Sequence, residues 1–140
     1  MPEIINYKEE WNVVYVNSFG EVTLEEVQNS IQEVSLLMQQ LPTKNLIVDV
    51  SKQCKPLELL ETFTICKDHM PTLPPDMKIA YIVASRPQQS HKFFTLLSES
   101  LGFPVRAFMS IDNARYWFQY GYTQKTKTIG KVKFPSTQKS

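Results

Sequence analysis

The chain has 140 residues, 42% of them hydrophobic and 21% charged, a balance typical of a single soluble globular domain. No apolar run approaches the ~18 residues that a membrane-spanning helix needs. The N-terminus also lacks the basic and apolar regions of a secretory signal peptide. These features predict a cytoplasmic protein without a membrane span.

The net charge of +1 is unevenly distributed along the chain. Residues 123–140 contain five Lys and no acidic residue, so the rest of the chain is acidic. We therefore predict a domain at residues 1–122 and a basic C-terminal tail at residues 123–140. The tail has no Arg and a single aromatic residue, Phe134. We interpret it as a solvated end, and we expect no nucleic-acid partner.

The first elements are two strands and a helix. Residues 4–11 and 12–19 alternate in the manner of strands and predict an antiparallel pair. Thr23 and Glu26 have the spacing of a capping box, which predicts that an amphipathic helix begins at Thr23. Pro42 ends that helix.

Two later units repeat one pattern, in which a buried strand ends in polar residues and a Pro begins the next helix. The strands are residues 46–50 and 79–84, and the helices begin at Pro56 and Pro87. A short strand at residues 104–108 and a final helix follow. The order ββαβαβαβα predicts an α/β fold with a mixed, mostly parallel sheet and helices mainly on one side.

Candidate binding residues lie where the parallel strands end, the edge at which open α/β sheets bind ligands. Ser51 and Arg86 follow two of the strands, and Ser90 and His91 belong to the first turn of the next helix. Helix N-termini and an Arg favour anions, so we predict an anion-binding or ligand-binding rim from these four residues. A solvated Arg beside an exposed His is the alternative. Asp49 ends a buried strand, and we interpret it as a structural cap.

Motifs for catalysis are missing from the sequence. It has no glycine-rich phosphate loop and no G-x-S-x-G nucleophile elbow. Its two His and two Cys are too widely separated to match a metal-ligand pattern. We therefore predict a protein that is not an enzyme, with no catalytic residues, no metal site and no cofactor.

Three segments resemble the STAS-like domains, and within them the SpoIIAA-like group. They are GEVT at residues 20–23, LIVD at residues 46–49, and a closing strand and helix at residues 105–117. The resemblance implies a STAS-like fold and a role in binding a partner protein. Many STAS domains are switched by a phosphorylated Ser or Thr at the helix after the Asp-ending strand. Residues 54–58 offer no hydroxyl there, so we expect no such switch.

The resemblance thus implies a regulatory protein-interaction module similar to an anti-sigma-factor antagonist. Such a module binds a partner protein or forms a homodimer. The alternative is a carrier of a small anionic or lipid ligand, because the SpoIIAA-like group is similar in architecture to CRAL-TRIO lipid-binding domains. A carrier requires an apolar pocket, whereas an interaction module requires a closed core and an exposed patch.

Overall fold

The computed structural model describes residues 3–121, so the basic tail at residues 123–140 lies outside the described part. The described residues form one five-stranded sheet in the order β1-β2-β3-β4-β5. β1 is antiparallel to β2, and the other neighbouring strands are parallel. The strands are β1 Glu3–Lys8, β2 Val13–Glu21, β3 Asn45–Lys55, β4 Lys78–Ile82 and β5 Val105–Phe108, and the helices are α1 Leu24–Gln40, α2 Leu59–Thr64, α3 Gln89–Ser100 and α4 Ile111–Tyr120.

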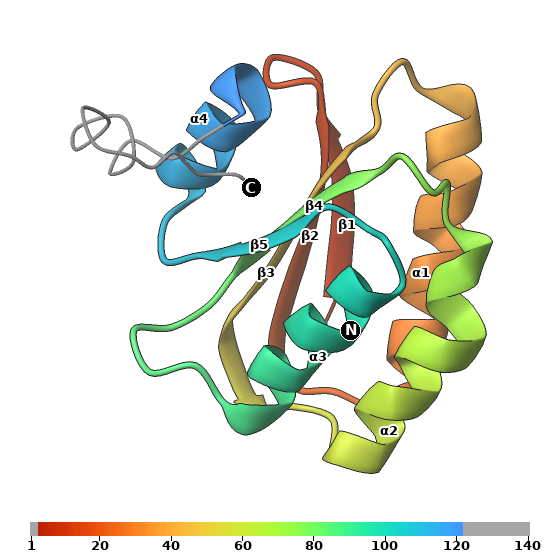
Figure 1. Cartoon of the computed structure of the whole chain (residues 1–140), viewed down its shortest axis with the longest axis vertical. Helices are drawn as coiled ribbons and strands as arrows, with labels where there is room; N and C mark the ends of the chain where they lie inside the picture. The colour runs from red at the N-terminus through yellow and green to blue at the C-terminus, as the bar shows by residue number, and fades with distance from the viewer. Residues whose placement is uncertain (1–2, 122–140) are drawn as a thin grey trace.

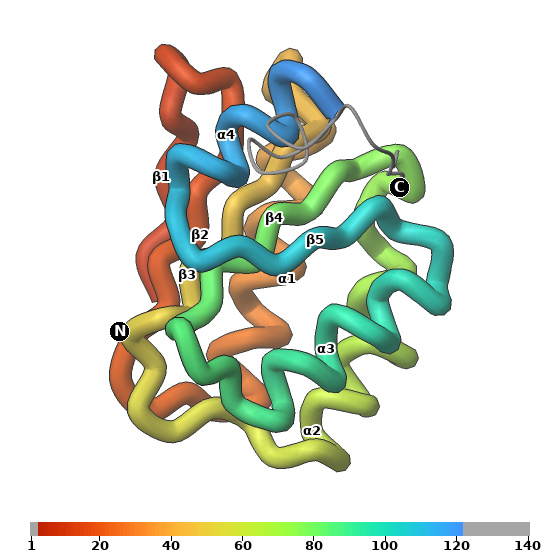
Figure 2. Tube along the Cα trace, turned by 60° about the vertical axis from the view of Figure 1, so that its left-hand side comes forward, coloured from red at the N-terminus to blue at the C-terminus, as the bar shows by residue number. Residues whose placement is uncertain are grey.

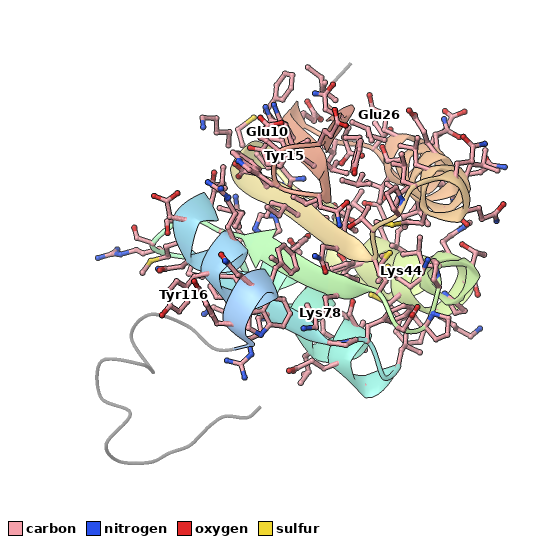
Figure 3. The ribbon with its side chains drawn as sticks, turned by 90° about the horizontal axis from the view of Figure 1, so that it is seen from above. Glu10, Tyr15, Glu26, Lys44, Lys78 and Tyr116 are labelled. Atoms are coloured by element: carbon pink, nitrogen blue, oxygen red, sulfur yellow. The ribbon has the colours of Figure 1, made fainter. Side chains whose placement is uncertain are left out.

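Three helices cover one face of the sheet and α4 covers the other (Figures 1 and 3). Each crossover from β2 to β5 moves one strand along the sheet in the same direction. Crossovers of the same hand then place α1, α2 and α3 on the same face. The chain turns to the opposite face only after β5, which is the last strand among residues 3–121. The predicted fold class and element order are confirmed.

Successive side chains along each strand point to opposite faces of the sheet, and this alternation divides the core into two layers. In β3, Leu46 and Val48 pack in the cluster beneath the three helices, whereas Ile47 packs in the cluster beneath α4. In the same way β4 places Ile79 under the three helices and Ala80 under α4. Both faces of these central strands are therefore buried, which explains their nearly continuous apolar sequence.

The predicted start of α1 is confirmed in atomic detail. The Thr23 hydroxyl accepts a hydrogen bond from the Glu26 N–H at 3.2 Å, and the Glu26 carboxylate accepts one from the Thr23 N–H at 2.9 Å. These two bonds satisfy N–H groups that a helix end leaves without an intrahelical partner.

Several element boundaries differ from the sequence-based expectation. β3 continues to Lys55, because β2 also extends and Gly20 pairs with Gln53 after a shift in register. The longer strand delays α2, which begins at Leu59 and not at Pro56. α3 begins at Gln89, two residues after the predicted start at Pro87.

The helix after β3 changes its winding twice. α2 passes into a π-helical turn, η1 (Ile65–His69), and then into a 3₁₀ turn, η2 (Met70–Thr72). Figure 2 shows α2 and α3 side by side on the helical face of the sheet. Turns of the π type occur frequently at functional sites. Here Ile65 and Met70 line the cavity described below.

Candidate functional site: a cavity between the sheet and three helices

A cavity of about 90 Å³ lies between the sheet and the helical layer formed by α1, α2 and α3. Its wall is mostly aliphatic, with Val16, Ile31 and Leu46 among the lining residues. Several polar side chains also reach this wall, and they come from every layer around the cavity. They are Glu3, Ser30, Gln53, Thr62, Tyr81, Ser90 and His91.

Four of the nearby polar side chains form a directional chain of hydrogen bonds. His91 Nε2 lies 2.7 Å from Gln53 Oε1, and Gln53 Nε2 donates to Ser18 Oγ at 2.7 Å. The hydroxyls of Ser18 and Ser30 bond in turn to the carboxyl group of Glu3. The chain joins α3, β3, β2 and β1 across the end of the sheet. It leaves these groups satisfied within a largely apolar environment.

The hydrogen bonds determine the tautomer of His91. Gln53 uses its Nε2 to donate to Ser18, so its Oε1 accepts from His91. His91 must therefore carry its proton on Nε2 and keep a lone pair on Nδ1. Burial lowers the pKa of His91 to about 4, so the ring is neutral at physiological pH. Nδ1 is then a hydrogen-bond acceptor.

Glu3 lies at the other end of the chain. Burial raises its pKa above the ordinary value, while the bonds from Ser30 and Ser18 act in the opposite direction. Burial, followed by the charge of Glu3, also raises the pKa of Tyr81. Glu3 is the single acidic side chain among the described residues that line the cavity, and these residues include no Lys or Arg.

Ser90 differs from the other polar groups because its hydroxyl has no partner. The residue is 8% exposed, and its Oγ is buried without a hydrogen bond from any of the residues 3–121. A buried hydroxyl without a partner costs free energy on the order of 1–3 kcal/mol. Ser90 is also one of the residues that line the cavity.

Aromatic rings form one side of the cavity. The rings of Tyr81 and Phe94 stack with their centroids 4.5 Å apart, and the His91 ring meets Tyr81 edge-on at 5.8 Å. All three residues line the cavity. Such contacts hold the imidazole in a defined orientation next to the apolar space.

The four residues of the predicted rim do not lie together. Ser90 and His91 are buried in the cavity wall, and the His91 ring is neutral. Arg86 is exposed in the loop before α3. Ser51 bonds to Asp49, and Asp49 bonds in turn to Tyr15, which packs against the cluster beneath α4. The sheet therefore separates Ser51 from the cavity.

Asp49 anchors the other face of the sheet. Its Oδ1 accepts from the Ser51 N–H at 3.0 Å and the Ser51 hydroxyl at 2.6 Å, and its Oδ2 accepts from the Tyr15 hydroxyl at 3.1 Å. Burial and the Asp49 carboxylate raise the pKa of Tyr15 to about 12. These bonds join β2 to the middle of β3 and serve no helix N-terminus.

A second hollow, of about 510 Å³, lies on the α4 side, between the turn after β1 and α4. Its lining is evenly polar and apolar, and Arg115 lies over the Trp11 ring at 4.3 Å from the centroid. None of the residues that line this hollow is itself buried, whereas Ser90 and His91 are buried in the wall of the cavity under α1, α2 and α3. We therefore assign the candidate site to the smaller cavity.

Three residues of the hydrogen-bonded polar chain were not identified in the sequence analysis. The sequence pattern could have identified Ser18, because it continues the alternation of the inward-facing residues Val14 and Val16 and is polar. No sequence pattern pointed to the other two residues, because Glu3 lay near the chain end and Gln53 lay in a predicted loop. Their importance depends on pairing between β1, β2 and β3.

Comparisons with known proteins add no assignment. No family model, curated protein or solved structure matches this chain. Among residues 3–121, no helix combines the length and apolar character required to cross a membrane. The same residues contain no group of three or more His, Cys, Asp or Glu side chains placed to hold a metal ion.

Proposed function

We propose that this protein is a non-enzymatic binding module that holds a small, largely apolar molecule in the cavity under α1, α2 and α3. The observation that carries the proposal is an apolar cavity with a buried, unpartnered hydroxyl in its wall. Small-molecule sites combine an apolar lining with a few placed polar groups in this way. The proposal favours the small-ligand alternative over the interaction module that the STAS-like resemblance implies.

The cavity volume limits the size of the molecule. An apolar cavity of ~150 Å³ in another protein holds benzene. A space of about 90 Å³ is smaller, so it limits the ligand to a short chain or to one ring that the wall admits through a small shift of its side chains. A two-chain lipid would require α2 or α3 to move away from the sheet.

Filling the cavity tests this proposal. Ile31 lines the cavity from α1, whereas Leu36 lies on the same helix with 55% of its surface exposed. We expect Ile31→Phe to weaken the binding of toluene at least tenfold, because the larger ring occupies the same space. Leu36→Phe serves as the matched control and should bind toluene as the unaltered protein does. Titrations followed by NMR would measure both affinities.

Equal toluene binding by the Ile31 variant and the unaltered protein would contradict the proposal. Native mass spectrometry of gently purified protein provides an independent measurement. A small bound molecule, absent from the Ile31→Phe protein, would support the proposal and provide the ligand's mass.

Self-association through α2 is a second candidate function, in keeping with the interaction role that the resemblance implies. Leu59, Leu60 and Phe63 on this short helix are 42%, 76% and 43% exposed. Neighbouring exposed apolar side chains often mark a contact surface. They favour a homodimer that buries α2.

Sedimentation velocity tests the second candidate. We expect the unaltered protein to sediment as a dimer and Leu60→Ser to sediment as a monomer, because the substitution places a hydroxyl in the centre of the contact. Leu36→Ser, on the exposed surface of α1, should leave the dimer intact. A monomeric unaltered protein would exclude this function.

A further inference from the structure

We propose that the cavity selects an uncharged ligand that donates a hydrogen bond, such as a small phenol or alcohol, with its hydroxyl directed at His91 and Ser90. The inference rests on the proposed function and adds the chemical class of the ligand. It is carried by the direction of the hydrogen bonds around the cavity and by the one hydroxyl that they leave without a partner.

The polar chain has a fixed direction. Each donor points toward Glu3, from His91 through Gln53 and Ser18. Every member of this hydrogen-bond chain donates toward the carboxyl group. The acceptor atom that still lacks a donor therefore lies at the opposite end. That acceptor is Nδ1 of His91, which the tautomer leaves with a lone pair. A ligand that meets this end must therefore donate.

Ser90 supplies the second polar contact. It precedes His91 in the first turn of α3, and both side chains line the cavity. Its buried Oγ has no partner among the described residues and can either accept or donate a hydrogen bond. A ligand hydroxyl can donate to His91 and accept from Ser90 together. A group without a hydroxyl or N–H can at most accept from Ser90, and it leaves Nδ1 of His91 without a donor.

The cavity is unsuited to charged ligands. No Lys or Arg is among the described residues that line it, and the carboxyl group of Glu3 would repel an anion. A cation would lose its hydration in an apolar space, and Glu3 already accepts bonds from Ser18 and Ser30. The nearby Tyr81 and Phe94 rings favour a ring or an apolar chain on the rest of the ligand.

Phenol and toluene form a matched pair of probes, because they differ only in a hydroxyl and a methyl group of similar size. We expect the unaltered protein to bind phenol at least fivefold more tightly than toluene, which corresponds to one satisfied hydrogen bond. Benzoate and benzylammonium should each bind at least tenfold more weakly than phenol. NMR titrations at pH 7 would measure all four affinities.

Two variants identify the groups that select the hydroxyl. Ser90→Ala removes an oxygen that bonds to no described residue, so the fold should tolerate it. It should reduce the preference for phenol to about twofold or less and leave toluene binding unchanged. His91→Phe removes the acceptor and should abolish the preference.

The outcomes separate this inference from the proposed function. Equal binding of phenol and toluene would overturn the inference and leave the proposed function standing. A phenol preference that survives both variants, or a charged probe that binds as tightly as phenol, would also overturn it. Failure of every probe to bind would overturn both proposals.

Discussion

We expect Asp49→Ala to destabilise the protein by about 3 kcal/mol. The carboxylate is 5% exposed and accepts three hydrogen bonds, two from Ser51 and one from Tyr15. Its removal leaves these half-buried donors without their acceptor. Bonds to a charged group contribute ~1.5–3 kcal/mol each, and the cost of burying the charge offsets part of their sum.

Urea unfolding of four proteins would measure this effect and apportion it: the unaltered chain, Asp49→Ala, Tyr15→Phe and the double variant. Tyr15→Phe alone should cost about 1.5 kcal/mol, because it removes one of the three bonds to the carboxylate. The double variant should be more stable than the sum of the two single losses predicts, since both remove the same bond. An Asp49→Ala protein as stable as the unaltered chain would show that the bonds only balance the cost of burying the charge.

Acidification should destabilise the protein through His91. The folded pKa is about 4 because of burial, below the ordinary value of 6.5 that the unfolded chain retains. The unfolded state therefore binds a proton first, and stability present above pH 6.5 is lost as the pH falls toward 4. We expect this loss to reach about 2 kcal/mol, after allowance for solvent screening of the charge.

Unfolding measurements between pH 7.5 and pH 4 would test this expectation with a matched pair of variants. His91→Phe should lose the acid-dependent component, whereas His69→Gln should retain it, because His69 is only partly buried and is not in the polar chain. The raised pKa of Glu3 acts in the opposite direction, since its buried charge costs stability as the pH rises. Both variants retain Glu3, so the comparison isolates His91. An NMR titration of His91 with a midpoint near 6.5 would contradict the argument.

The helices and the class of sheet were accessible from local sequence patterns. Thr23, Glu26 and Pro42 mark the ends of α1 through bonds and backbone restrictions that involve only near neighbours. The apolar runs of β3 and β4 indicated strands buried on both faces, and two α/β units in succession indicated a parallel sheet. These signals are short in range, and so a sequence pattern can carry them.

The end of β3 depended on distant pairing. The extension of β3 from Val50 to Lys55 follows from its continued pairing with β2, some thirty residues earlier in the chain. That extension turns Gln53 from a predicted loop residue into a strand residue that faces the cavity. Local propensity contained no information about this pairing.

The sequence by itself determined the α/β class, the order of the elements and the presence of Ser90 and His91 at the start of a helix beside the sheet. Only the tertiary structure decided that these two residues face an apolar cavity, that Arg86 remains in solvent and that Ser51 lies across the sheet. The physical reason is the alternation of side chains along a strand. A shift of one residue moves a group to the opposite face, so a shared strand edge does not by itself make a shared site.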